Sequence, residues 1–252
     1  MERTSLTHDD LPKEIGTLRI VYLTDIHKGG LYTDTDLANL VTQVNSLRAD
    51  IILLGGDYAT DPESAVAFFK SCPSFHASYA VLGVLGDTDR SGGEVDLQSV
   101  RSAMVAAGIT PLVNEVARVR IGGSASVYIA GLDDSTGGTP DAASVAKQVG
   151  QDDYVILLAH SPSVIPDALA ATDKDGHKNW FDLGLFGHTH GGQLAIGGTL
   201  LVGGDVEDRY RGGWLQENRI DLLISRGVGT TGLPIRFLCK PQIHVITVSS
   251  GS

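Results

Sequence analysis

The chain has 252 residues and a formal net charge of −11, from 19 basic and 30 acidic side chains. This acidity argues against nucleic acid as the main partner and against tight binding to anionic lipid, because both need clustered Lys and Arg. The length suffices for a substantial core, and no repeat, low-complexity segment or clear linker divides it. We therefore expect one domain over residues 1–252.

The first part of the chain alternates between apolar runs and helical periodicity. Strands are predicted at 18–24, 51–54 and 79–85, and helices at 34–48, 62–70 and 94–107. Asp34 is the expected N-cap of the first helix, Pro62 opens the second, and Gly108 stops the third. Three strand–helix units in a row are typical of a layered α/β domain.

The second part is richer in strands. A hairpin is predicted around Gly122 and Gly123, and one helix is predicted at 141–149. The predicted strands are 115–121, 126–130, 154–159, 183–186, 200–202, 220–224 and 242–248. A second strand-rich segment after the first one favours a second sheet.

Asp and His side chains recur in order along the chain, mostly where a predicted strand ends. They are Asp25, His27, Asp57, Asp87, His160, His188 and His190. Active groups of α/β sheets gather at the carboxyl ends of strands. Carboxylate and imidazole ligands without thiolate suit manganese, iron or zinc. Each residue alone would be an ordinary turn residue, but the ordered set predicts a two-metal hydrolytic centre.

The remaining histidines and the cysteines fit no such pattern. Cys72 and Cys239 lack metal-type spacing and are expected to be reduced, in or near the core. The other four histidines are expected to be structural or exposed: His8, His76, His177 and His244.

The order of these motifs resembles that of the calcineurin-like metallophosphoesterase superfamily, from about residue 18 to 248. The segments 187–193, 225–229 and 234–237 resemble its YkuE/YaeI-type branch. The resemblance implies a layered α/β/β/α sandwich of two facing mixed β-sheets flanked by helices. It also implies two metal ions per chain, with Mn²⁺ the first choice and iron or zinc the alternatives.

The resemblance also assigns a ligand to each ion. Asp25, His27 and His190 would bind the first ion. Asp87, His160 and His188 would bind the second. Asp57 would bridge both.

One segment departs from the family, which has G-N-H-D where this chain has Gly86-Asp87-Thr88-Asp89. In the family, the His helps to protonate the leaving oxygen and the acidic residue orients that His. Thr88 is no useful acid at neutral pH, and Asp89 would serve only with a raised pKa. Asp87 in place of Asn adds a carboxylate, which lowers the positive charge of the loaded site by one. The candidate catalytic residues are Asp57, Asp87, Thr88 and Asp89.

These features predict a binuclear metal-dependent phosphohydrolase that attacks phosphoesters with a metal-activated hydroxide. Without a strong acid, it would favour phosphodiesters or good leaving groups, on a small-molecule or lipid-linked substrate. One alternative is a pyrophosphate-cleaving hydrolase of a nucleotide-linked lipid precursor resembling UDP-diacylglucosamine. The other is a metal-binding scaffold with little turnover.

Two interpretations are open for each group that would select a substrate. Arginines near the motifs would hold phosphate or be ordinary surface residues: Arg90, Arg226 and Arg236. Tyr210 and Trp214 would line a substrate groove or pack.

No apolar stretch is long enough to span a bilayer, and Met1 to Glu14 lacks the apolar core of a signal peptide. We expect a cytoplasmic protein or one peripheral to the membrane, with any membrane association encoded outside this chain. A naturally soluble protein and a chain trimmed from a longer anchored one both fit.

Overall fold

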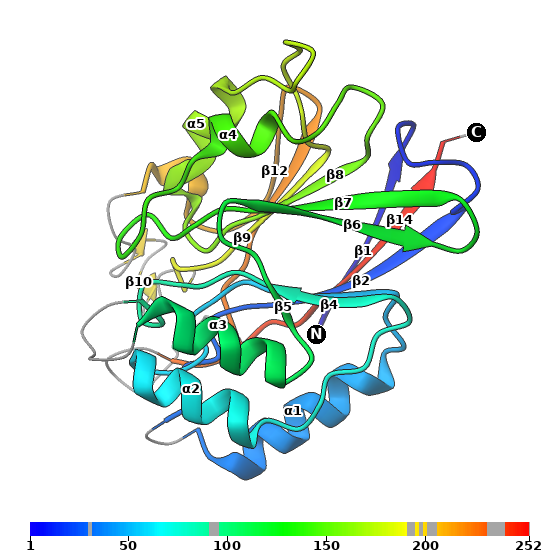
Figure 1. Ribbon diagram of the computed structural model, residues 1–252. Helices are drawn as coiled ribbons and strands as arrows, with labels where there is room; N and C mark the ends of the chain where they lie inside the picture. Colours follow the sequence, from blue (N-terminus) through cyan, green and yellow to red (C-terminus); the bar gives the residue numbers. More distant parts are fainter. Residues whose placement is uncertain are drawn as a thin grey trace.

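The computed structural model describes residues 1–29, 32–90, 96–190, 195–196, 199–200, 206–230 and 240–251. Two six-stranded mixed sheets face each other, and helices cover the outer face of each (Figure 1). The predicted α/β/β/α sandwich is therefore confirmed.

The first sheet has the strand order β1-β14-β2-β3-β4-β5. The bounds are β1 Glu2–His8, β2 Thr17–Leu23, β3 Ile51–Leu54, β4 Ala80–Gly83, β5 Thr110–Pro111 and β14 His244–Ser250. Strands β2 to β5 run parallel, while β14 runs antiparallel to β2. Every residue of β3 is buried, as expected of a parallel strand covered on both faces.

The second sheet has the order β12-β13-β9-β8-β7-β6. The bounds are β6 Glu115–Ile121, β7 Ala125–Gly131, β8 Val155–Leu158, β9 Leu183–Phe186, β12 Gly213–Glu217 and β13 Ile220–Ile224. Strands β7, β8, β9 and β13 are parallel, and β6 with β7 forms the predicted hairpin. A separate antiparallel pair joins β10 Ala195–Ile196 to β11 Thr199–Leu200.

Helices α1 Asp34–Ser46, α2 Pro62–Ser71 and α3 Leu97–Ala106 lie on the first sheet (Figure 1). Helices α4 Ala142–Ala146 and α5 Ile165–Ala170 lie on the second sheet. Short 3-10 turns occur at Pro162–Val164 and Asp208–Tyr210. None of the helices in the described ranges is long and apolar enough to cross a bilayer.

Three layers of apolar side chains hold the two sheets and the two sets of helices together. One layer joins α1, α2 and α3 to the first sheet, and another joins α4 and α5 to the second. The central layer lies between the sheets and includes Ile20, Leu53, Ile156 and Leu185. Alternate residues of a strand point to opposite faces, so β3 contributes Ile52 to the helical side and Leu53 to the central layer.

The predicted N-cap of α1 was wrong by one residue. Thr33, and not Asp34, is the cap: its hydroxyl accepts from the N–H of Asp36, whose carboxylate accepts from the N–H of Thr33. This reciprocal capping box satisfies two backbone donors at once. Asp34 instead lies in the first turn and pairs with Lys28 at 2.6 Å.

Other elements were missed or shortened. The sequence did not predict β1, β5, β10, β12 or α5, and the helix expected at 141–149 covers only 142–146. Residues 94–95 of the third predicted helix, 201–202 of a predicted strand, and Cys239 lie outside the described residues. Cys72 is a free thiol, partly buried, and packs against the core layer beneath the first three helices.

The capping box gives a stability prediction. Thr33→Ala removes the cap hydroxyl and should lower the free energy of unfolding by about 1 kcal/mol. Thr42→Ala is the matched control, because Thr42 is exposed inside the same helix and only bonds back to the carbonyl of Ala38. Alanine favours helix interiors, so this control should be neutral or slightly stabilising in urea unfolding. Equal effects of the two substitutions would contradict the cap.

Candidate metal centre

Five strand ends meet at one edge of the sandwich. Asp25 and His27 follow β2, Asp57 follows β3, and Asp87 follows β4, all in the first sheet. The second sheet contributes three histidines after β8 and β9: His160, His188 and His190. Parallel strands place their carboxyl ends at the same edge, so residues far apart in sequence become neighbours.

The backbone turns sharply at these strand ends. Five of the seven predicted ligands have left-handed φ angles, although none is glycine: Asp25 52°, His27 43°, Asp57 55°, His188 66° and His190 51°. Such conformations cost about 1–3 kcal/mol each and gather at functional sites. The surrounding fold must therefore impose these turns.

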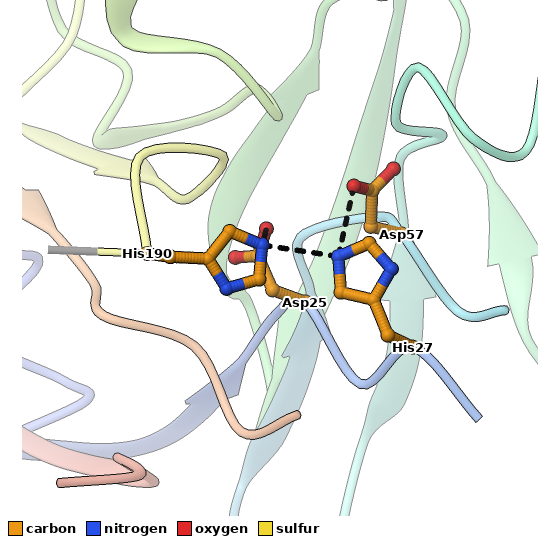
Figure 2. A group of neighbouring side chains, drawn as sticks. All are labelled: Asp25, His27, Asp57 and His190. Carbon is orange, nitrogen blue, oxygen red and sulfur yellow. Dashed lines mark hydrogen bonds and ion pairs between the residues drawn. The ribbon is translucent and has the colours of Figure 1, made fainter. Parts of the chain in front are cut away.

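The first group of side chains comprises Asp25, His27, Asp57 and His190, and all four are buried. Figure 2 shows the imidazoles of His27 and His190 pointing toward one another, with the two carboxylates beside them. The Nε2 atoms of the two rings are 3.0 Å apart. The Nε2 of His190 lies 3.5 Å from Asp25 Oδ1, and that of His27 lies 3.2 Å from Asp57 Oδ2.

The second group comprises Asp87, His160 and His188. Asp87 Oδ1 lies 3.2 Å from His160 Nε2 and 3.1 Å from His188 Nδ1. The other ring nitrogen of His160 bonds to the carbonyl of Gly55 at 2.8 Å. A carbonyl only accepts, so His160 Nδ1 carries a proton, and Nε2 is the ring atom that faces Asp87.

Burial and charge act against each other in these groups. Burial alone would raise the pKa of Asp57, but His160 and His27 outweigh it and hold the pKa well below its usual value. Burial would lower the pKa of His160, yet Asp57 and Asp87 raise it well above normal. The pKa of His27 is likewise raised, mainly by Asp57, against the effect of burial. The cluster therefore attracts positive charge.

This donor set fits divalent cations. The nitrogen and oxygen atoms of each group lie within 4.8 Å of one another. Two imidazole nitrogens that face each other at 3.0 Å, as in His27 and His190, need a proton or a cation between them. Imidazole and carboxylate ligands without sulfur suit manganese, iron or zinc.

Thr88 and Asp89 are also brought to this site, but both contact protein groups. The Thr88 hydroxyl lies 2.8 Å from Asp57 Oδ1. Asp89 is 1% exposed, and its oxygens accept from the N–H groups of Asp57, Tyr58 and Gly86. Burial and the charge of Asp57 raise the pKa of Asp89 to about 7. The raised pKa suits an acid, but the carboxyl group is buried and enclosed by backbone N–H groups.

The residues predicted to bind phosphate or to line a groove have different surroundings. Arg90 pairs with Asp133 at 3.2 Å and bonds to the Gly137 carbonyl, whereas Arg226 is exposed and Arg236 lies outside the described residues. The buried Tyr210 bonds through its hydroxyl to Glu217. Trp214 is exposed.

Sequence reasoning missed Asp133, which follows β7 at the same strand ends and holds Arg90. The signal was present: an aspartate shortly after an apolar run, as for Asp57.

The four remaining histidines lie apart from the centre. His8 bonds to Tyr154 and Asp221, His244 is buried against Ser225, and His76 is exposed. His177 lies with Asp173 and Asp175 in a third group that has metal-ligand geometry. His177 and Asp175 are exposed in this group, and the carboxylate of Asp173 accepts from backbone N–H groups of its own loop.

Comparison with known proteins agrees with this geometry. The family model for calcineurin-like phosphoesterases matches residues 18–192. An uncharacterised metallophosphoesterase of Bacillus subtilis, YkuE, is 30% identical over 247 residues, which cover 95% of this chain and 82% of YkuE. The phosphodiesterase YaeI of Escherichia coli is 29% identical, over 90% of this chain and 81% of YaeI.

Some relatives are longer. This chain spans 62% of an uncharacterised metallophosphoesterase of Helicobacter pylori, to which it is 29% identical. The match nevertheless covers 96% of this chain. The chain therefore belongs to the calcineurin-like phosphoesterase family and is a metal-dependent phosphoester hydrolase.

Proposed function

We propose that the protein is a two-metal phosphohydrolase that prefers phosphodiesters, or other phosphoesters with good leaving groups. The substrate would be a small-molecule or lipid-linked phosphoester. Mn²⁺ is the first choice for both sites, with iron or zinc as alternatives, because the ligands are carboxylates and imidazoles.

The position of Asp57 carries this proposal. Its Oδ2 atom lies 3.2 Å from His27 Nε2 in the first group and 3.4 Å from His160 Nε2 in the second. One carboxylate oxygen thus contacts a ligand of each group. Two separate mononuclear sites would not need such a shared atom, whereas a binuclear centre requires a bridge.

The two groups differ in how open they are. The ligands of the first group are 0–5% exposed. In the second, the side chains of Asp87 and His188 are 28% and 23% exposed. A phosphoester would therefore approach from the side of Asp87 and His188, while the first group stays enclosed.

Two divalent cations in these groups would supply an activated water and neutralise charge on the phosphoryl oxygens. The protein residues hold the geometry around that chemistry. His160 donates from Nδ1 to Gly55, which leaves Nε2 as the ring atom that would bind a cation. His188 is oriented through its backbone N–H, which donates to Asp25 Oδ1 at 3.1 Å.

Thr88 and Asp89 stand where the family has its acid, and neither offers a strong acid to the leaving group. Thr88 lacks an acidic proton near neutral pH, and its hydroxyl is directed at Asp57. Asp89 is enclosed by three backbone donors. Substrates whose leaving groups depart as stable anions are therefore favoured.

The first prediction concerns metal content. Chelator-treated protein that is reloaded with Mn²⁺ and freed of excess should retain two ions per chain by elemental analysis. Asp34→Asn, at an exposed carboxylate on α1, should retain the same number. A stoichiometry near zero for the wild-type protein would contradict the ligand assignment. Two bound ions without turnover of any activated phosphoester would support a scaffold.

The second prediction separates a bridge from a terminal ligand. Asp57→Asn should lose far more activity and bound metal than Asp87→Asn, because Asp57 contacts ligands of both groups. An amide oxygen can still serve at position 87, so that variant should keep most of its metal. Comparable losses in the two variants would show that the roles are misassigned.

The third prediction concerns the leaving group. General acid catalysis contributes about a hundred- to ten-thousand-fold, so its absence should make the rate depend steeply on leaving-group pKa. Bis-p-nitrophenyl phosphate and pyrophosphate-type bonds should be cleaved well, and alkyl esters poorly. Rates for a series of substituted aryl phosphodiesters, plotted against phenol pKa, measure this slope. Simple alkyl monoesters hydrolysed as fast as p-nitrophenyl esters would reveal another acid.

A further inference from the structure

Thr88 makes two hydrogen bonds to the carboxylate of Asp57. Its backbone N–H donates to Asp57 Oδ1 at 3.1 Å, and its hydroxyl oxygen lies 2.8 Å from the same atom. The hydroxyl also lies 2.8 Å from the carbonyl of Ala59. A hydroxyl has one hydrogen to give, and a charged carboxylate is the stronger acceptor. Asp57 Oδ1 is therefore held by two donors from one residue.

These contacts give the two carboxylate oxygens of Asp57 different partners. Oδ1 faces Thr88, whereas Oδ2 faces His27 and His160. A carboxylate that rotated about its χ2 torsion would exchange the oxygens and lose this order. The two donors of Thr88 oppose such rotation, so the oxygen that faces the metal groups is fixed.

The neighbouring residues prepare the same arrangement. Asp89 accepts the backbone N–H of Asp57 at 2.8 Å and that of Gly86 at 2.9 Å, which ties the ends of β3 and β4 together. A Cβ atom at Gly86 would collide with Asp57 Oδ1. Glycine at that position therefore lets the carboxylate approach Thr88.

We infer that Thr88 is a positioning residue that orients the Asp57 carboxylate for binding of both ions. This inference rests on the proposed two-metal function. It gives the threonine a role other than proton donation to a leaving group. Thr88 acts through Asp57 and need not touch the substrate, so its effect must appear in metal binding even when no substrate is present.

The test uses the full chain, titrated with Mn²⁺ alone after metal removal. Thr88→Val keeps the shape of the side chain but removes the hydroxyl, and should weaken manganese binding by about 10- to 100-fold. Thr88→Ser keeps the hydroxyl and should bind near the wild-type affinity. Electron paramagnetic resonance should show a spin-coupled manganese pair in wild type and Thr88→Ser, and more uncoupled manganese in Thr88→Val.

Tyr58→Phe is the matched control. The Tyr58 hydroxyl donates to the carbonyl of Val84 at 2.8 Å, so its removal also costs a buried hydrogen bond, in the residue that follows Asp57 in the chain. That hydroxyl makes no hydrogen bond to the carboxylate of Asp57 within the described residues. The control should lower thermal stability and leave manganese affinity unchanged. Thr88→Ala removes the hydroxyl without placing a methyl group against Ala59, and carries the same test if Thr88→Val fails to fold.

The outcomes separate this inference from the proposed function. Wild-type protein that binds two manganese ions, with unchanged affinity in Thr88→Val and Thr88→Ala, would overturn the inference and leave the function standing. A loss in Thr88→Ser as large as in Thr88→Val would also overturn it, because the hydroxyl would then not be the cause. Wild-type protein that binds none of manganese, iron and zinc would remove the proposed function together with the inference.

Discussion

The contact of His160 with Asp57 and Gly55 is the interaction on which the site depends. His160 follows β8 in the second sheet, whereas both partners follow β3 in the first. Its ring donates to the Gly55 carbonyl at 2.8 Å and lies 3.4 Å from Asp57 Oδ2. A fully buried imidazole with both nitrogens engaged fixes the separation of the sheets at this edge. The remaining ligands meet only because that separation is held.

The site is costly for the fold to maintain. Five predicted ligands have left-handed backbones, and Asp25, Asp57 and Asp89 are buried carboxylates. Without cations, protonated histidines offset part of the charge, as the raised pKa values of His27 and His160 indicate. The three apolar layers supply the stability that permits such strain. Strain and buried charge together therefore mark the strand ends as a site kept for function.

Much of the fold follows from the sequence because buried parallel strands leave a clear pattern. The apolar run 51–54 coincides with β3, and Asp57 follows it in the chain and in space. Edge elements such as β1 and β12 were missed because their residues alternate between partial burial and exposure. The contact of Thr88 with Asp57 spans 31 residues and depends on how β3 and β4 end. No spacing rule encodes a contact of that kind.

Charge explains why an acidic protein can still act on an anionic substrate. The chain has a formal charge of −11, and the three carboxylates Asp25, Asp57 and Asp87 contact the site histidines. A phosphoester would be repelled from this surface as long as the carboxylates are not neutralised. In the proposed two-metal centre, two divalent cations would bring four positive charges against three negative ones, which would leave one net positive charge at the open side near Asp87 and His188. An Asn at position 87 would leave two. Under the proposed function, this chain would rely less on attraction between the site and its substrate, and more on the orientation of Asp57 and on the leaving group.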